Sequence, residues 1–250
     1  MPFIDFNCDL GEGMPTDEAI MPYISSANIA CGYHAGDSAT MKQTVEHCLR
    51  YQVAIGAHPS YPDRENFGRT NKQLPADEIF NLVKIQIEIL QEIATSFHKK
   101  LQHVKPHGAL YNMAAKEAEI AEAIACAVKE VDPGLLLFGL PGSEMEKAAA
   151  KYHLSYVGEA FADRTYQPDG SLTPRNLPDA LITTEAAAAE QVLQIIRQHT
   201  VTTTSGTIIP LRASTICVHG DGKNAVSLAA TLHKTLIREG ITIQSFNIKR

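Results

Sequence analysis

The chain has 250 residues, of which 44% are hydrophobic and 20% charged, and its formal net charge is −6. These values are ordinary for a soluble globular protein with a sizeable core. No apolar run reaches the roughly 18 residues of a transmembrane helix, so none is predicted. An acidic balance without a basic cluster argues against a nucleic-acid partner and against an anionic membrane surface.

The N-terminus and the cysteines favour a cytoplasmic location. Residues 1–5 have neither a basic start nor an apolar signal core, so we expect no export. The five cysteines are an odd number without metal-ligand spacing. We expect them to be reduced and buried as small hydrophobic side chains.

In the first half of the chain, short apolar runs alternate with amphipathic segments. Asp37 or Ser38 can cap one helix, and Pro75 precedes the longest one, whose apolar residues recur every three or four positions. The apolar runs predict strands at 3–8, 27–31, 53–57 and 102–105, and the periodic segments predict helices from about 38 to 49 and from 76 to 98.

The second half continues the alternation, with one hairpin and one irregular segment. Residues 201–211 have a turn at Ser205-Gly206 and predict the hairpin, while 165–178 show no periodicity and are expected to form a surface loop near the site. The remaining predicted strands are 135–140, 154–157, 214–218 and 241–246, and the predicted helices are 120–131, 144–152, 186–199 and 225–236.

Strand and helix thus alternate seven or eight times without a linker or a change in composition. Parallel strands require such crossovers, and strands buried on both faces are apolar throughout. The pattern predicts an α/β fold in one domain over residues 1–250. Close to eight units in this length favour a (β/α) barrel over an open doubly wound sheet.

Polar side chains follow most of the predicted strands, and four of the ten histidines do so. The connection after the strand at 53–57 is unusually long and rich in charged and aromatic residues. Because the carboxyl ends of barrel strands converge at one mouth, we expect a single site there. The residues expected to face it are Asp9, His34, His58, Lys105, His107, Glu159, Asp163, Arg164, His219 and Asp221.

Several of these side chains also have purely structural explanations. Asp37 and Asp221 are suited to cap helices, and Lys105 can extend its ammonium group to water. Glu65 and Arg69 can form a surface ion pair of little energetic value. Taken together, however, so many ionisable groups in one concavity are costly unless a substrate or ion offsets their repulsion.

Around the first strand end, two glycines flank acidic residues. This arrangement predicts a tight turn that exposes Asp9 and Glu12.

Familiar catalytic and nucleotide-binding motifs are absent from the sequence. There is no Gly-x-Ser-x-Gly, His-Glu-x-x-His or Cys-x-x-Cys, and no Gly-x-Gly-x-x-Gly follows a strand. Segment 220–224 is nearest to a phosphate loop, but it lacks the first glycine and the Ser/Thr after the lysine. We therefore expect no binding of ATP or NAD by a familiar loop.

Six longer motifs resemble the LamB/YcsF family, in the family's order and across nearly the whole chain. They are Asn-Cys-Asp-Leu-Gly-Glu-Gly at 7–13, Ser-Ala-Asn-Ile-Ala-Cys-Gly-Tyr-His-Ala-Gly-Asp at 26–37, Gly-Ala-His-Pro-Ser-Tyr-Pro-Asp-Arg at 56–64, Lys-Pro-His-Gly-Ala-Leu-Tyr-Asn at 105–112, Glu-Ala-Phe-Ala-Asp-Arg at 159–164 and Cys-Val-His-Gly-Asp at 217–221.

The resemblance implies a distorted seven-stranded (β/α) barrel of the glycoside hydrolase/deacetylase type. It also implies ATP-dependent opening of the cyclic amide 5-oxoproline to L-glutamate, with this chain as the lactam-hydrolysing member of a three-component complex. The implied partners are the 5-oxoprolinase subunits B and C. The absence of a nucleotide loop here agrees with ATP being bound by those partners.

For this reaction, five residues are assigned catalytic roles as hypotheses. Asp9 or Asp163 would be the general base, and His58 would be a second proton carrier. His107 and His219 would polarise the carbonyl group or protonate the leaving nitrogen.

Five further residues are assigned to substrate binding. Lys105 and Arg164 would hold the substrate carboxylate, Arg164 with bidentate geometry. Asn7, His34 and Glu159 would complete the binding site.

Two other functions stay open at this point. Asp9, His34 and His58 could form the metal site of a deacetylase-like hydrolase, with an open position for water. Alternatively, the chain could be a non-catalytic substrate-binding or regulatory subunit. In that case its carboxylates would affect affinity but not turnover.

Overall fold

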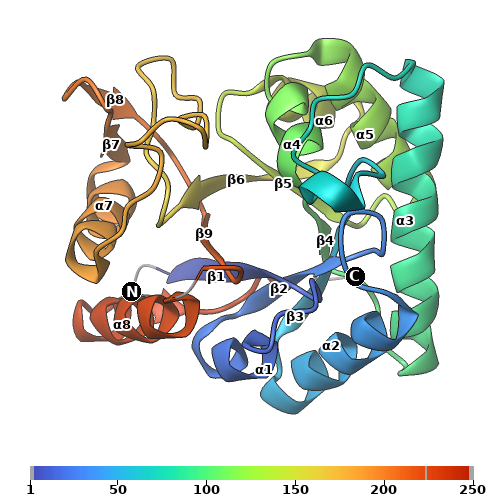
Figure 1. The fold of residues 1–250 in the computed structure, drawn as a ribbon, viewed down its shortest axis with the longest axis horizontal. Coiled ribbons are helices and arrows are strands. Elements are labelled where there is room, and N and C mark those ends of the chain that lie inside the picture. Colours follow the sequence, from blue (N-terminus) through green and yellow to red (C-terminus); the bar gives the residue numbers. More distant parts are fainter. Residues whose placement is uncertain (1–2, 223, 248–250) are drawn as a thin grey trace.

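The computed structural model describes residues 3–222 and 224–247, and its centre is a closed barrel of seven parallel strands (Figure 1). The strands pair in the order β1-β2-β3-β4-β5-β6-β9, and β9 pairs back to β1. Their bounds are β1 Phe3–Leu10, β2 Ser26–Ala30, β3 Ala54–His58, β4 His103–Val104, β5 Leu136–Gly139, β6 Ser155–Phe161 and β9 Thr215–His219. The predicted seven-stranded barrel is confirmed.

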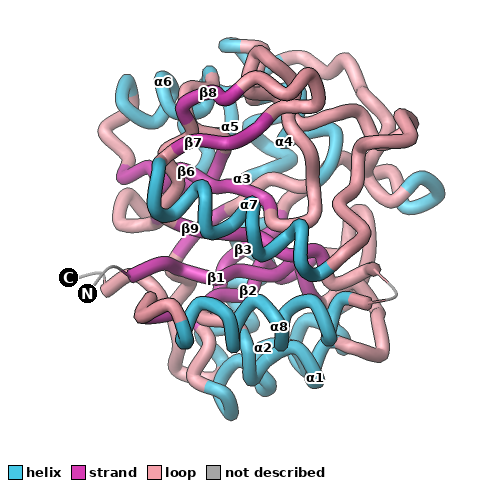
Figure 2. Tube along the Cα trace, turned by 90° about the vertical axis from the view of Figure 1, so that its left-hand side faces the viewer, coloured by secondary structure: helices cyan, strands magenta, loops and turns pink. Residues whose placement is uncertain are grey.

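Helices surround the barrel, and Figure 2 shows α1, α2 and α8 together on one side of β1 and β2. Within the described ranges, no helix is long and apolar enough to cross a membrane. The bounds are α1 Asp17–Ile20, α2 Ser38–Tyr51, α3 Ala76–Ser96, α4 Gly108–Ala114, α5 Ala118–Val131, α6 Glu144–Lys151, α7 Glu185–Gln198 and α8 Ala225–Arg238, with single 3-10 turns at Met21–Tyr23 and Arg64–Asn66.

The longest helix illustrates how the apolar periodicity positions the layers. In α3, Ile79, Val83, Ile87 and Leu90 are fully buried, one above the other on the face that packs against the barrel and α5. The N-cap predicted for α2 is also present, since the carboxylate of Asp37 accepts a hydrogen bond from the backbone N–H of Thr40 at 2.8 Å.

Three elements differ from the sequence-based prediction. Strand β6 continues to Phe161, so Glu159 lies inside the strand rather than after it. The last predicted strand, 241–246, shortens to β10 (Thr242–Ile243), which pairs with β1 beside the barrel. Helix α4 was not predicted, because it is only seven residues long and largely buried, and so has no amphipathic pattern.

The predicted hairpin at 201–211 is confirmed. Its strands β7 (Thr200–Thr202) and β8 (Ile208–Pro210) pair in antiparallel orientation, with Thr202 opposite Ile208. The segment 165–180 that precedes α7 forms only isolated bridges, for example between Tyr166 and Leu172.

Strand β1 separates an apolar layer from a polar one. Phe6, Cys8 and Leu10 are fully buried in the hydrophobic core. The intervening side chains point into the barrel, because successive residues of a strand face opposite sides. They are Asp5, Asn7 and Asp9, and each is buried and hydrogen-bonded to side chains of neighbouring strands.

Asp5 forms the lowest layer of this polar interior. Its carboxylate accepts hydrogen bonds from the hydroxyls of Ser25 at 2.7 Å, Ser26 at 2.5 Å and Thr215 at 2.5 Å. Burial nevertheless raises the pKa of Asp5 from 3.8 to about 6, because the three hydroxyls only partly replace water and the nearby Glu159 carboxylate raises the pKa further.

We expect Asp5 to make stability fall as pH rises from about 4 to 6. The unfolded chain loses the Asp5 proton near its ordinary pKa of 3.8, whereas the folded protein keeps it until about pH 6. The unfolded state therefore binds fewer protons in this window, and raising pH favours it by on the order of 3 kcal/mol. Urea unfolding of wild type and Asp5→Asn at several pH values measures the difference.

The exposed Asp77→Asn variant is the control, and its pH profile should run parallel to that of the wild type. Parallel profiles for wild type and Asp5→Asn would contradict the assignment.

Candidate active site

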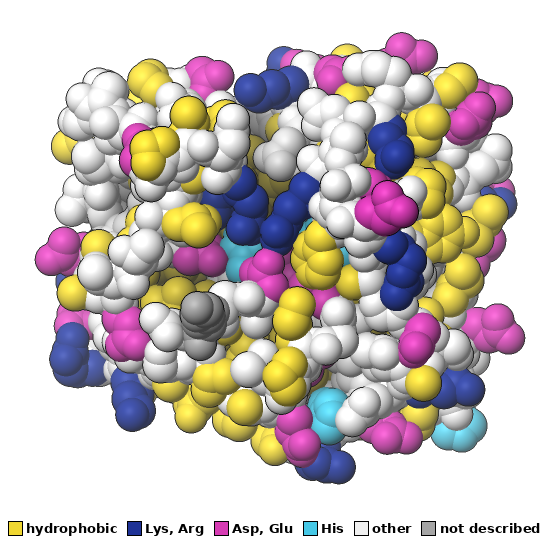
Figure 3. Space-filling view, in the orientation of Figure 1, with side chains coloured by type: hydrophobic (Ala, Val, Ile, Leu, Met, Phe, Trp, Pro, Cys, Tyr) yellow, Lys and Arg dark blue, Asp and Glu magenta, His cyan; other side chains and the backbone are white. Residues whose placement is uncertain are grey.

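A cavity of about 400 Å³ opens at the carboxyl ends of the barrel strands. Figure 3 shows a hollow near the middle of this face, where basic, acidic and histidine side chains gather. Six of the residues predicted for the site line the cavity: Asp9, His58, Lys105, His107, Arg164 and His219.

The other four predicted residues lie beside the lining rather than in it. Asn7 and Glu159 are in the barrel interior, where the side-chain amide of Asn7 donates to Glu159 Oε1 at 3.0 Å. The ring of His34 stacks on that of His107, with centroids 3.8 Å apart. Asp163 contacts the ring of His219. The structure therefore brings eight of these ten residues to one end of the barrel, with Asn7 and Glu159 in the interior beneath them.

Lys105 is the centre of the polar interior beneath the cavity. Its ammonium group lies 2.8 Å from Asp9 Oδ1, 2.9 Å from Glu159 Oε1 and 3.0 Å from the sulfur of Cys217. The side chain is only 2% exposed, so the expectation that it extends to water is wrong. With its donors directed at these partners, the ammonium group acts within the protein as a fixed countercharge.

The contacts around Lys105 determine whether Asp9 is ionised. Burial alone opposes its ionisation, but His58 and Lys105 hold the pKa of Asp9 well below its usual value. Burial also opposes the charge of Lys105, yet Asp9 and Glu159 hold the pKa of the ammonium group well above its usual value. Both groups are therefore charged at neutral pH, and Asp9 is a weak base.

Asp163 and His219 form a hydrogen-bonded pair at the cavity wall. Ring nitrogen Nδ1 of His219 lies 2.9 and 2.8 Å from the two carboxylate oxygens of Asp163. Burial works against this carboxylate, but the adjacent His219 keeps the pKa of Asp163 below its usual value. The pairing places the Nδ1 proton toward Asp163, so in the neutral ring the lone pair is on Nε2 and faces away from Asp163.

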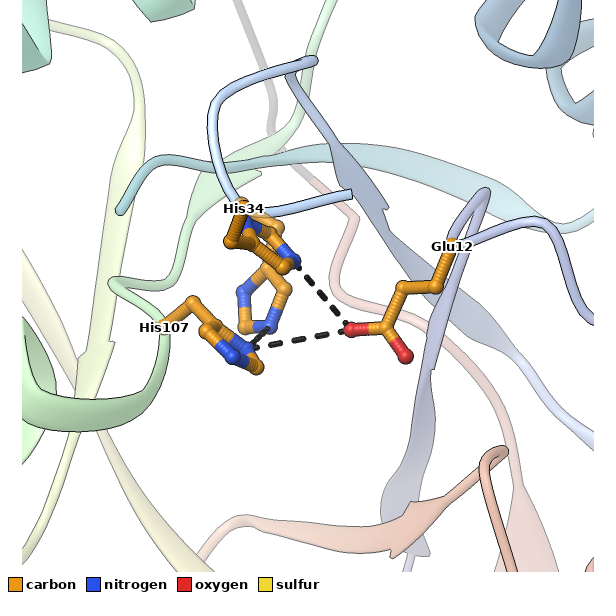
Figure 4. A group of neighbouring side chains, drawn as sticks. Glu12, His34 and His107 are labelled. Carbon is orange, nitrogen blue, oxygen red and sulfur yellow. Dashed lines mark hydrogen bonds and ion pairs between the residues drawn. The ribbon is translucent and has the colours of Figure 1, made fainter. Parts of the chain in front are cut away.

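A second group gathers at the ends of β1, β2, β3 and β4. Glu12, His34, His58 and His107 each offer one ligand atom, and these atoms lie within 4.8 Å of one another. Figure 4 shows Glu12 pointing at His34 and His107. Glu12 Oε1 is 3.3 Å from His34 Nε2 and 3.8 Å from His107 Nδ1. We call these four residues the histidine cluster.

Burial controls the charge of the histidine cluster. Together with the neighbouring His58, it lowers the pKa of His34 to about 2. Burial and the rings of His34 and His58 also hold the pKa of His107 well below its usual value. Both rings are therefore neutral at pH 7. Burial and Asp9 raise the pKa of Glu12 well above its usual value.

The tight turn after β1 was expected to expose both Asp9 and Glu12, and this prediction is wrong. Both are buried, with only 4% and 8% of their surfaces exposed. The turn is instead covered by the Gly36 segment, and a Cβ atom at Gly36 would lie only 2.3 Å from the carbonyl oxygen of Gly11. This close approach, at a φ of +70°, requires glycine.

Two arginines at the cavity were also missed as site residues. Arg69 was expected to pair with Glu65, but its guanidinium lies 2.6 Å from Asp221 Oδ2. Asp221 is therefore an ion-pair partner rather than the N-cap of α8, which is Asn224. Arg175 lies in the irregular segment 165–180, where the sequence gives no periodicity to place it. Lys223, in the rejected phosphate loop, lies outside the described residues.

Arg164 has a structural role beside its place in the cavity lining. Its guanidinium donates to the backbone carbonyls of Thr173 at 2.5 Å and Ala180 at 3.3 Å. These bonds secure the segment 165–180, which carries Arg175 over the cavity.

Comparison with known proteins identifies relatives along the whole chain. The LamB/YcsF family model matches residues 4–250. A 5-oxoprolinase component from Bacillus mycoides (strain KBAB4) is 49% identical over 249 residues, which cover 97% of this chain and 98% of the relative. The lactam utilization protein of Thermus thermophilus has a TM-score of 0.92 at 38% identity, covering 98% of this chain and all of that one.

More distant structures share the fold alone. A family 4 carbohydrate esterase of Streptomyces lividans aligns with a TM-score of 0.50 at 12% identity, over 99% of this chain and 94% of that one. This similarity agrees with the predicted glycoside hydrolase/deacetylase type of barrel.

Replacing Lys105 by methionine should strongly destabilise the protein. The substitution keeps the side-chain length but leaves the buried Asp9 and Glu159 carboxylates without their cation, which costs about 3–5 kcal/mol. Chemical denaturation measures the loss. In a Glu159→Gln background the cost of Lys105→Met should be smaller, since one of the two carboxylates is already neutral.

Lys84→Met is the matched control, because Lys84 on α3 forms surface ion pairs with Glu88 of the same helix and Glu130 of α5. It should change stability by less than about 1 kcal/mol. Equal effects of the two substitutions would contradict the role given to Lys105.

Proposed function

Because the chain belongs to the LamB/YcsF family, we propose that it hydrolyses the lactam ring of 5-oxoproline to L-glutamate within an ATP-hydrolysing complex. The names of the Bacillus and Thermus relatives support a lactam substrate. The observation that carries the proposal is the Asp163–His219 pair at a cavity that also has arginine side chains in its lining. A small cyclic amide with one carboxylate needs both features.

Opening a lactam requires a base for water and an acid for the leaving nitrogen. His219 can be both in turn, since its Nε2 has a lone pair directed away from Asp163. His219 removes a proton from water as the water oxygen attacks the carbonyl carbon. The C–N bond then breaks, and His219 returns the proton to the nitrogen, which becomes the amino group of glutamate.

Asp163 positions the ring in this scheme and stabilises the imidazolium that forms. The geometry favours this division over a carboxylate base. Asp163 is directed at His219 Nδ1, and Asp9 is neutralised by Lys105, so both carboxylates are weak bases.

The substrate carboxylate fits the basic side of the cavity. Arg175 and Arg164 are both in the lining, as is His219. A guanidinium group presents paired donors that match a carboxylate. We assign this contact to Arg175. Lys105 has an electrostatic role, because its ammonium donors already face Asp9, Glu159 and Cys217, and Arg164 already donates to two backbone carbonyls.

ATP belongs to the partner subunits in this proposal. An unstrained amide is a poor electrophile, so coupling to ATP would activate the lactam before water attacks. The sequence has no glycine-rich phosphate loop that would bind the nucleotide. We therefore assign ATP binding to the 5-oxoprolinase subunits B and C, and binding and hydrolysis of the activated ring to this chain.

The test is glutamate formation by the complex reconstituted from this chain and subunits B and C. Asp163→Asn and His219→Asn should each lower kcat by roughly 100- to 10,000-fold, because proton transfer to and from water is lost. The matched controls are Asp179→Asn and His199→Asn, which change exposed residues of the same types and should leave kcat unchanged.

Other outcomes would contradict specific parts of the proposal. Variants that raise KM at unchanged kcat would indicate a substrate-binding subunit without a catalytic role. A wild-type complex that forms no glutamate from 5-oxoproline and ATP would refute the function itself.

A further inference from the structure

We propose that the histidine cluster (Glu12, His34, His58 and His107) binds one divalent transition-metal ion of the zinc class. Their converging ligand atoms lie within 4.8 Å of one another at the base of the cavity wall. The argument depends on where the ring protons are, which follows from the outer hydrogen-bond partner of each ring. The site is independent of the proposed lactam substrate.

His34 has its proton on the outer nitrogen. Its Nδ1 lies 2.8 Å from the hydroxyl oxygen of Ser60. That hydroxyl donates to the carbonyl oxygen of Tyr61 at 3.0 Å, so it accepts from His34. Nε2 of the neutral ring therefore presents a lone pair to Glu12.

The same reasoning applies to the other two rings. Nδ1 of His58 donates to the carbonyl oxygen of Lys105 at 2.7 Å, and Nε2 of His107 donates to that of Phe67 at 2.9 Å. A carbonyl oxygen only accepts, so both outer nitrogens carry protons. The inner nitrogens, His58 Nε2 and His107 Nδ1, then face each other at 2.9 Å, and His58 Nε2 also lies 3.5 Å from Asp9 Oδ2.

Without a metal ion, this arrangement needs two protons, one between His58 Nε2 and His107 Nδ1 and one between Glu12 and His34 Nε2. A proton shared by His58 and His107 leaves His34 Nε2 facing a Glu12 carboxylate oxygen at 3.3 Å, with no donor between them. A proton on Glu12 serves His34 but not the contact between His58 Nε2 and His107 Nδ1. One cation at the centre serves all four atoms.

The distances and charges are those expected of such a site. A tetrahedral ion with bonds of about 2.0–2.1 Å separates its ligands by about 3.3 Å. Three of the six distances between the ligand atoms, 2.9, 3.3 and 3.8 Å, lie near this value, and all six are at most 4.8 Å. In addition, within the described chain no lysine or arginine forms an ion pair with Glu12.

The donor set defines the class of metal. Three imidazole nitrogens and one carboxylate oxygen suit zinc and its neighbours rather than calcium or magnesium, which prefer oxygen. Outer hydrogen bonds to carbonyl and hydroxyl oxygens are also the usual environment of histidine ligands. Because His58 and His107 line the cavity, an ion there could polarise a substrate oxygen or activate water.

The primary test measures binding to the full chain without an affinity tag and without substrate. Protein treated with a chelator is titrated with Zn²⁺ by calorimetry, and the bound metal is counted by elemental analysis. We expect one ion per chain. With Co²⁺ in place of Zn²⁺, we expect the visible absorption of a nitrogen-coordinated ion of low coordination number.

Variants locate the site. Glu12→Gln and His107→Asn should each weaken Zn²⁺ binding at least tenfold and change the Co²⁺ spectrum. Ser60→Ala removes the acceptor that orients His34 but no ligand atom, so it should weaken binding by roughly 10- to 100-fold. The control His98→Asn changes an exposed histidine and should leave binding unchanged. Circular dichroism verifies that each variant is folded.

Two results would overturn the proposal. One is a folded wild-type chain that takes up less than a stoichiometric amount of both ions. The other is unchanged affinity in folded Glu12→Gln and His107→Asn, which would show that the metal binds elsewhere. Because no turnover is measured, either result leaves the proposed lactam hydrolysis to be judged separately.

Discussion

The polar interior of the barrel depends on one buried cation, the ammonium group of Lys105. It lies between Asp9 on β1 and Glu159 on β6, and its own residue follows β4, so it connects three strands across the barrel. Without it, ionised carboxylates in this interior would be prohibitively costly. With it, Asp9 can also accept a hydrogen bond from Asn28, and His103 in turn contacts Asn28. The floor of the cavity is built on this network.

Above that floor, the cavity joins two sets of groups with different chemistry. In the first set, Nδ1 of His219 donates a hydrogen bond to Asp163, and Nε2 is the nitrogen that can exchange a proton with a ligand. The histidine cluster brings one nitrogen from each of three rings and a carboxylate within 4.8 Å of one another. A ligand in the cavity can therefore meet a proton carrier from one side and an electron-pair-rich centre from the other. Arg164 and Arg175 add positive charge to the same lining.

Most strands and helices of the barrel could be predicted because short sequence patterns determine them. Apolar runs gave the strands, periodic stripes such as Ile79 to Leu90 gave the helices, and polar residues at strand ends indicated the site. The misses have non-local causes. Burial of Glu12 depends on the approach of Gly36, and the partner of Arg69 is Asp221, far along the chain. Residue propensities and motif spacing do not predict contacts between residues so far apart in the chain.

The connection from β3 to α3 limits the size of the ligand that the cavity can admit. Ser60 supplies the acceptor for one ring of the histidine cluster, and Phe67 supplies the acceptor for another. Gly68 of the same connection accepts a hydrogen bond from Ala109 at the start of α4. Displacing this segment to admit a bulkier ligand would also release the imidazoles to rotate. The size of ligand that the cavity admits and the alignment of the imidazole rings are therefore coupled, and a substitution in this connection affects both.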